Sequence, residues 1–166
     1  MLPVDPVVPG PGQESVWDYP RPPRLDPSRE KVVVRFGGHL IGQTKRAIRV
    51  LETSHPPTYY LPLSDFERRV ITGAPGGSFC EWKGHATNFD ILGKDEQVAP
   101  AAAWGYAAPL PGFEALRGHV AVYAGLMDEC TVDGERVEPQ PSGSYGGWIT
   151  SRVVGPFKGV PDSRYW

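Results

Sequence analysis

Residues 31–43 read KVVVRFGGHLIGQ, two apolar runs joined by a pair of glycines. Glycine adopts positive φ without steric cost, so paired glycines between apolar runs are typical of the tight turn of a β-hairpin. Further short runs follow, each bounded by turn residues: RAIRVLE, TYYLP, SFCEWK, TNFDIL, AAAWGYA, HVAVYAG, CTVDGERV and GGWITSRVV. Their lengths and spacing predict an all-β fold of the sandwich or barrel type.

A few stretches predict other local structure. SDFERRVI (residues 64–71) begins with two residues that cap helices, and FEALRG (residues 113–118) ends in glycine, so each predicts a short helix. GAPGGS (residues 73–78) predicts a turn. VDGE (residues 132–135) contains the Asp-Gly pair of a hairpin turn.

Composition limits the class of protein. The 166 residues are 40% hydrophobic and 22% charged, which suits one globular domain with its own core. The 17 basic and 19 acidic residues nearly cancel and form no basic stripe, which argues against nucleic-acid binding. The opening MLPVDPVVPGPG has no feature of a secretion signal, and no apolar run approaches the ~20 residues of a membrane helix. We therefore expect a soluble, cytoplasmic protein without a membrane partner.

The chain divides at about Arg29. Eight prolines fall before this point, and proline offers no amide proton to a helix or sheet. We expect residues 1–29 to form an extended, proline-rich arm, either a free tail or a wrap anchored by Trp17 and Tyr19. Residues 30–166 are expected to form a single domain.

ETSHPPTYY (residues 52–60) concentrates ionisable and aromatic groups. Glu52 ends the apolar row of the preceding strand, and the residue before a proline favours extended backbone, so His55 lies in a stiff turn. Successive side chains of a strand point to opposite faces, so at most one of Tyr59 and Tyr60 enters a given pocket. The stretch predicts either a rigid pocket rim or a turn with only a structural role.

SFCEWK (residues 78–83) and AAAWGYA (residues 101–107) carry further candidates. Strand alternation places Cys80 and Trp82 on one face of the first run and Lys83 on the other. Trp104 and Tyr106 share a face in the second run.

Several of these blocks occur together, in the same order, in one bacterial family. ETSHPPTYYLP, FCEWKGHA, AAAWGYAAP, GGWIT and GPFKGVP resemble domain-of-unknown-function family 427 (DUF 427) from about Lys31 to Trp166. The resemblance implies a β-tent, in which two antiparallel sheets are pinned along one edge and splay apart at the other. Relatives by fold include the ligand-binding domain of cereblon and methionine sulfoxide reductase B.

Two properties associated with these relatives find no match here. A structural zinc held by two CxxC pairs is not expected, because Cys80 and Cys130 stand alone and the four histidines are scattered. The nucleotidyltransferase label of the family requires paired metal-binding carboxylates after a phosphate loop. Asp90 follows GAPGGS, but the second position is Leu92. We therefore expect no metal and no cofactor.

The candidate site is an aromatic pocket with sparse polar groups, the composition of many small-molecule sites. By analogy with the cereblon relative it would hold an imide-like or cationic ring. The alternative is that the tryptophans are core residues, an interpretation that we favour for Trp104. The expected ligand-binding residues are Glu52, His55, Tyr60, Cys80, Trp82, Lys83, Trp104 and Trp148.

Three functions remain open from the sequence. A small-molecule-binding module ranks first. A hydrolytic or redox enzyme that uses Cys80 or His55 ranks second, because a thiol whose pKa is lowered by His55 or Lys83 would be a nucleophile and Cys130 could resolve a disulfide. A protein-interaction domain that uses the arm and an open sheet edge ranks third. The sequence does not indicate an oligomeric state.

Overall fold

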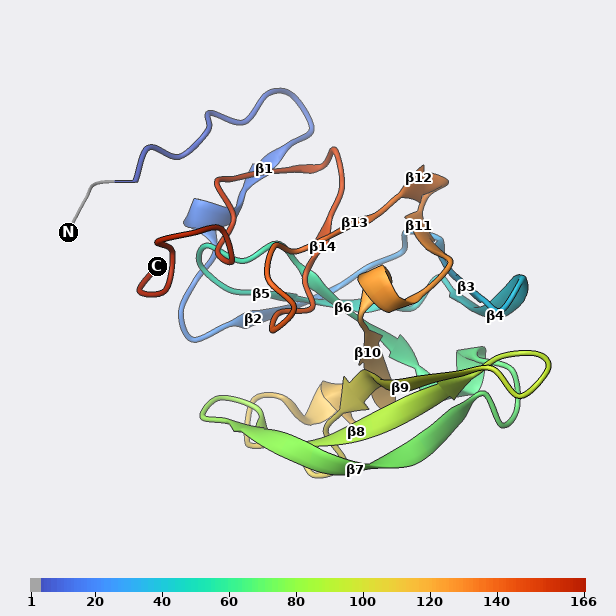
Figure 1. The fold of residues 1–166 in the computed structure, drawn as a ribbon. Coiled ribbons are helices and arrows are strands. Elements are labelled where there is room, and N and C mark those ends of the chain that lie inside the picture. The colour runs from blue at the N-terminus through green and yellow to red at the C-terminus, as the bar shows by residue number, and fades with distance from the viewer. Residues whose placement is uncertain (1–3) are drawn as a thin grey trace.

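The computed structural model describes residues 4–166, and its regular structure is almost entirely β-strand (Figure 1), which confirms the all-β prediction. Four single 3-10 turns interrupt the strands: η1 (Val16–Asp18), η2 (Leu63–Asp65), η3 (Glu114–Leu116) and η4 (Ala124–Leu126). The strands are β1 (Glu14–Ser15), β2 (Arg24–Pro27), β3 (Val32–Phe36), β4 (His39–Thr44), β5 (Ile48–Leu51), β6 (Thr58–Pro62), β7 (Ile71–Cys80), β8 (Gly84–Leu92), β9 (Val98–Gly105), β10 (His119–Val122), β11 (Glu129–Val132), β12 (Glu135–Arg136), β13 (Glu138–Pro139), β14 (Trp148–Ile149) and β15 (Val153–Val154).

Two large antiparallel sheets organise these strands. One has seven strands in the order β2-β5-β6-β10-β9-β8-β7, and the other has four in the order β12-β11-β3-β4. The seven-stranded sheet is not closed, since β2 and β7 are its two edges. In Figure 1, β7, β8 and β9 form a long curved layer, and β10 joins it to the β2-β5-β6 part near the chain's terminal segments. Two short pairs, β1-β15 and β13-β14, complete the structure.

Both predicted hairpin turns are confirmed. Gly37 and Gly38 have φ of 64° and 83°, and they connect β3 to β4 with Phe36 paired to His39. Asp133 and Gly134, at φ of 49° and 83°, connect β11 to β12 in the same way. Positive φ at both central residues gives the turn the twist of its flanking strands.

The short helix predicted at residues 113–118 is present as the 3-10 turn η3, whereas the helix predicted over residues 64–71 and the predicted GAPGGS turn are wrong. In residues 64–71 only the end of η2 is helical, because Phe66 packs over Gly42 and the Glu67 amide donates to the Ile41 carbonyl, which fixes extended backbone. GAPGGS lies inside β7, where the register shifts between Gly73 and Gly77. The glycines therefore form a bulge in an edge strand rather than a connection between strands.

The two faces of the seven-stranded sheet cover different clusters. On one face Tyr59 and Leu61 pack with side chains of the four-stranded sheet, such as Val34 and Cys130, in the main core. On the other face Tyr60 packs in a second cluster with the β5 side chain Val50. Tyr59 and Tyr60 thus point to opposite faces, as predicted, one into the main core and the other into the second cluster.

The proline-rich arm is part of this fold. Its first three residues lie outside the described residues, and residues 4–29 contribute β1, η1 and β2. Strand β2 pairs with β5 as an edge of the seven-stranded sheet. Val16 is fully buried, and the indole nitrogen of Trp17 donates to the Pro156 carbonyl at 2.9 Å. Of the two predicted forms of the arm, residues 4–29 adopt the wrap.

A buried arginine fastens the arm to the sheet. Arg49 on β5 is 1% exposed, and its guanidinium donates to Asp26 at 2.6 and 2.9 Å and to Glu14 at 3.0 and 3.2 Å. Arg152 adds ion pairs to Glu14 at 3.0 Å and to Glu30 at 3.1 Å. Charge-assisted bonds of this kind are stronger than neutral ones, and the five side chains link the arm, β5 and the C-terminal segment.

Replacement of Arg49 by methionine should destabilise the fold by about 3 kcal/mol, the low end for breaking a buried ion pair, because Glu14 and Asp26 are partly exposed and can rehydrate. Urea unfolding measures this loss. The control is Arg24→Met on the neighbouring strand, where the side chain is 59% exposed and the change should stay within about 0.5 kcal/mol. Equal effects of the two variants would contradict a structural role for the buried guanidinium.

The same network predicts sensitivity to acid. Burial raises the pKa of Glu14, but hydrogen bonds from Arg49 and Tyr19 and the charges of Arg49 and Arg152 outweigh burial and lower it from 4.5 to about 2. The stability that this carboxylate contributes is therefore complete above pH 4.5 and is lost as the pH falls towards 2. In urea titrations, Glu14→Gln should flatten the fall in stability across this window, and an unchanged slope would contradict the assignment.

Candidate functional site

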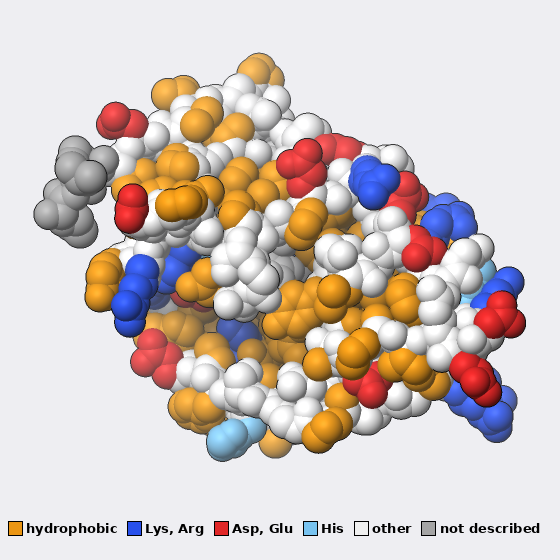
Figure 2. Space-filling view, viewed as in Figure 1, with side chains coloured by type: hydrophobic (Ala, Val, Ile, Leu, Met, Phe, Trp, Pro, Cys, Tyr) orange, Lys and Arg blue, Asp and Glu red, His pale blue; other side chains and the backbone are white. Residues whose placement is uncertain are grey.

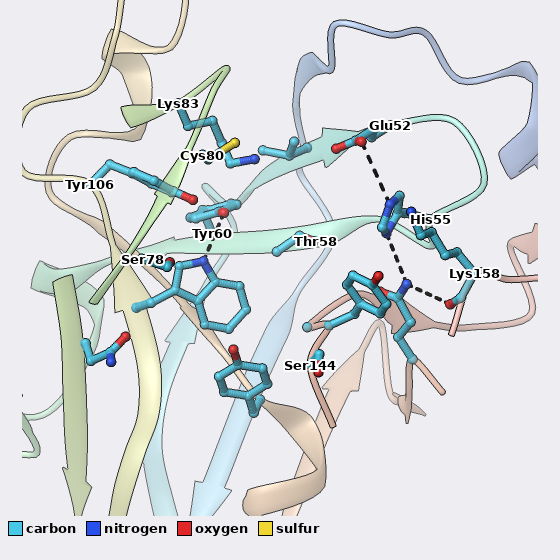
Figure 3. A pocket seen from close by; sticks show the side chains of 17 residues that line it. Glu52, His55, Thr58, Tyr60, Ser78, Cys80, Lys83, Tyr106, Ser144 and Lys158 are labelled. Carbon is cyan, nitrogen blue, oxygen red and sulfur yellow. Dashed lines mark hydrogen bonds and ion pairs between the residues drawn. The ribbon is translucent and has the colours of Figure 1, made fainter. Parts of the chain in front are cut away.

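A cavity of about 400 Å³ lies against the second cluster of the seven-stranded sheet. Strands β5 and β6, the β7–β8 hairpin and the end of β9 form one side, and the segment from Gln140 to Lys158 covers the other. In the space-filling view, hydrophobic side chains gather around a recess in the middle of the face shown, with most charged groups near the periphery (Figure 2). Figure 3 shows Lys83, Cys80 and Tyr106 on one side of the cavity and Glu52, His55 and Lys158 on the other.

Aromatic rings form one wall. Trp104 donates from its indole nitrogen to the Tyr60 hydroxyl at 3.3 Å, and its ring lies 4.5 Å from that of Tyr123 between centroids. Tyr60 also meets Tyr106 at 6.3 Å. Burial, followed by the nearby Tyr106, raises the pKa of Tyr60 well above its ordinary value of 10.0, so the hydroxyl is neutral at physiological pH. The wall therefore offers flat apolar faces with hydroxyl groups at their edges.

A short turn positions the polar groups at the opposite rim. The His55 amide donates to the Glu52 carbonyl at 3.0 Å, and Ser54 turns the chain with φ of 73°. The carbonyl of Pro57 accepts a hydrogen bond from the Trp148 amide at 2.8 Å, which fixes the end of the turn. The side chains of Glu52 and His55 consequently reach into the cavity from a backbone with little freedom (Figure 3).

Hydrogen bonds fix the tautomer of His55. The Gln140 carboxamide oxygen accepts from the Gly147 amide at 3.0 Å, and its nitrogen donates to the Lys158 carbonyl at 2.9 Å, so the amide has one orientation. That nitrogen also lies 3.1 Å from His55 Nδ1, which must then act as the acceptor. In the neutral ring the proton is on Nε2, 3.8 Å from Glu52 Oε2.

The charges near His55 act in opposite directions. Burial lowers its pKa, the Glu52 carboxylate raises it, and the positive charges of Lys158, Arg21 and Lys83 lower it. The net shift is downward from 6.5, because burial and three cations outweigh one carboxylate. His55 is thus a neutral hydrogen-bonding group at physiological pH.

Lys83 enters the cavity because the strand ends earlier than expected. Strand β7 stops at Cys80, and residues 81–83 form the turn to β8. The prediction that Cys80 and Lys83 point to opposite faces is therefore wrong, and both line the cavity. Lys83 is 8% exposed, and among residues 4–166 no carboxylate forms an ion pair with it. Its ammonium lies 5.8 Å from the centre of the Tyr106 ring, a contact worth about 0.5–2 kcal/mol, and it is accessible from the cavity.

The two cysteines occupy different environments. Cys80 lines the cavity and is partly exposed, but within the described chain it has no hydrogen bond to His55 or Lys83. Cys130 is 2% exposed in the main core on the other face of the sheet, and burial, with a smaller effect of Glu129, raises its thiol pKa to about 12. The two thiols therefore lie on opposite faces of the seven-stranded sheet, so Cys130 is not placed to pair with Cys80.

Two of the expected tryptophans do not line the cavity. Trp148 is 1% exposed in the main core, where it stacks on Tyr59 at 5.2 Å and donates to the Val122 carbonyl at 3.0 Å. Trp82 packs at the border of the second cluster, from the same turn that brings Lys83 inward. Trp104, which we assigned preferentially to the core, is the tryptophan of the cavity wall.

The cavity residues that sequence reasoning missed include Tyr123, Gln140 and Tyr145. Tyr145 packs edge-on against His55 at 5.3 Å and belongs to the glycine-rich stretch SGSYGG (residues 142–147). An aromatic residue between glycines is the signal that could have identified it. Two glycines of this stretch are required: a Cβ on Gly146 would overlap the Trp104 ring, and a Cβ on Gly147 would clash with the Pro56 carbonyl.

A second cavity of about 500 Å³ adjoins the first and is more apolar. Tyr123, Gln140, Tyr145 and Gly146 line both cavities, so the glycine-rich stretch is the partition between them. Within residues 4–166, no three metal-ligating side chains come together. The same part of the chain contains no helix long and apolar enough to cross a membrane.

The neutral state of His55 can be measured by NMR. We expect its imidazole to titrate with a midpoint below 6.5, because burial and the neighbouring cations disfavour the charged form. His55→Gln identifies the resonance among the four histidines. A midpoint above 6.5 would mean that Glu52 dominates and would contradict the proposed electrostatics.

The comparison with protein families bears on this site. A family model described as Domain of unknown function (DUF427) matches residues 24–133, from the first residue of β2 to the hairpin turn after β11. No curated protein matches the chain. The matched segment supplies the aromatic wall, Cys80 and Lys83, whereas Gln140, Tyr145 and Lys158 follow it. Because the match covers more than half of the sequence, the predicted resemblance is confirmed, and the chain belongs to the DUF427 family.

Proposed function

We propose that the protein is a small-molecule-binding module whose ligand occupies the cavity beside Tyr60. The observation that carries this proposal is the combination of an aromatic wall with polar groups whose orientation is already fixed. Tyr60 and Trp104 are hydrogen-bonded to each other, and Gln140 fixes the His55 ring. Groups ordered before binding lose less freedom when a ligand arrives, which favours affinity.

The size and composition of the cavity support the proposal. About 400 Å³ falls within the range of roughly 300–1,000 Å³ for small-molecule sites. Aromatic faces with a few polar groups are the usual lining of such sites. A planar ring of one or two fused cycles would pack against Trp104 and Tyr60, with its polar substituents directed to the hydroxyl and charged groups.

The two other functions have less support. A cysteine or histidine enzyme needs a nucleophile beside its base, and no such hydrogen bond is present at Cys80 in the described chain. An interaction domain built on the arm needs a free arm, whereas β2 pairs with β5. The opposite edge, β7, contains Pro75 and a bulge, both of which discourage pairing with another strand. We also propose a cytoplasmic location in bacteria, which two free cysteines suit.

Native mass spectrometry of the purified protein tests the proposal. We expect a non-covalent adduct that Trp104→Phe reduces at least tenfold, because the variant loses ring area and the bond to Tyr60. Trp82→Phe is the matched control, since Trp82 does not line the cavity and should leave occupancy unchanged.

Alkylation of the thiols gives a second readout. Iodoacetamide should modify Cys80 slowly in the occupied protein and faster after the ligand is removed, while Cys130 stays unmodified because it is buried and its pKa is high. An adduct that Trp104→Phe does not affect would locate binding elsewhere. Absence of any adduct, together with no protection of Cys80 by a panel of aromatic molecules, would contradict the proposed function.

A further inference from the structure

The cavity contains a positive charge that the fold itself does not use. Lys83 is 8% exposed, its ammonium lines the cavity, and the part of the chain that the structure describes gives it neither an ion pair nor a side-chain hydrogen bond. Its ammonium contacts the Tyr106 ring and is accessible from the cavity, so an anionic group of a ligand there would reach it.

The rest of the cavity does not neutralise this charge. Glu52 is the one carboxylate in the lining among residues 4–166, and it is already shared by Arg21 at 3.5 Å and His55 at 3.8 Å. Lys158 contributes a second ammonium, whose hydrogen bond goes to the main-chain oxygen of Trp166 at 3.3 Å. Two ammonium groups, those of Lys83 and Lys158, thus line the cavity together with one carboxylate.

The cations of the cavity also act on His55. Burial lowers its pKa most, Glu52 raises it, and Lys158, Arg21 and Lys83 each lower it. An anion placed in the cavity would meet favourable charge from Lys83 and hydroxyl donors from Thr58, Ser78 and Tyr106, which line it as well.

We propose that Lys83 is the anion-binding residue of the cavity and that its ligand is a small planar organic acid, with the ring on Trp104 and Tyr60 and the acidic group at the ammonium. This inference rests on the proposed function and specifies its ligand class. It replaces the cationic ring expected from fold analogy, because a cation would add to the unpaired charge. Carboxylate and phosphate share the required chemistry, and the test separates them.

Matched probes test the role of charge. Indole-3-acetate and indole-3-acetamide differ in the acidic group and share the ring, and phenyl phosphate provides the phosphate arm. In calorimetric titrations we expect indole-3-acetate to bind at least tenfold more tightly than the amide. Protection of Cys80 from iodoacetamide should follow the same order, because Cys80 lines the same cavity. Tighter binding of phenyl phosphate than of the carboxylate would assign a phosphate ligand and keep the role of Lys83.

Variants of the lysine separate this role from folding. Lys83→Met should abolish the preference for acid over amide without lowering the melting temperature of the ligand-free protein, because no carboxylate in residues 4–166 forms an ion pair with the ammonium. Lys83→Arg should keep most of the preference. Lys94→Met, at an exposed lysine between β8 and β9, is the control and should change neither property.

Several outcomes would overturn the inference. Equal binding of the acid and the amide would contradict the role of Lys83 but leave the proposed binding function intact. A natural ligand that is retained and is neutral or cationic would have the same consequence. A lower melting temperature of Lys83→Met would assign the lysine a structural role instead. Failure of every probe, together with no adduct in native mass spectrometry, would remove both this inference and the proposed function.

Discussion

The register of strand β6 (Thr58–Pro62) is the constraint on which both the core and the cavity depend. Its side chains alternate, so Tyr59 stacks on Trp148 in the main core while Tyr60 faces the cavity and holds Trp104. A shift of one residue would exchange the two tyrosines and destroy both arrangements at once. The antiparallel pairing of β6 with β5 and β10, together with the rigid Pro56–Pro57 start, holds that register.

The buried charge network extends this constraint to the ends of the chain. Arg49 on β5 lies opposite Tyr59 in the pairing, and its guanidinium joins Glu14 and Asp26 of the arm. The Tyr59 hydroxyl donates to Glu30 at 2.9 Å, so core, arm and network meet at one point. The network and the cavity lie on opposite faces of the same strands. One face holds charges in close ion pairs, whereas on the other Lys83 has no ion pair within residues 4–166, which is the contrast expected between structural and binding charges.

Sequence patterns predicted those features that depend on neighbouring residues. The hairpin turns at Gly37–Gly38 and Asp133–Gly134 follow from positive φ, and the divergence of Tyr59 and Tyr60 follows from the period of a strand. Features that depend on distant contacts were not predictable. That Trp148 lies in the core and Trp104 in the cavity wall depends on the pairing of β14 with β13, which local sequence does not reveal. The His55–Gln140 hydrogen bond joins residues 85 positions apart. Local propensity misled at residues 64–71, where packing on β4 prevents a helix, and at Lys83, where a turn interrupts the alternation.

The most direct test of the separation of core and cavity by β6 is ¹⁹F NMR of protein labelled with fluorotyrosine at its seven tyrosines. Tyr→Phe variants identify the resonances, which are followed during titration with indole-3-acetate. If β6 separates core from cavity, the resonance of Tyr60 shifts with the ligand, together with those of Tyr106, Tyr123 and Tyr145, while that of Tyr59 does not move. A Tyr59 shift as large as that of Tyr60, or a titration that moves none of the cavity tyrosines, would contradict the assignment of the two faces and of the binding site between them.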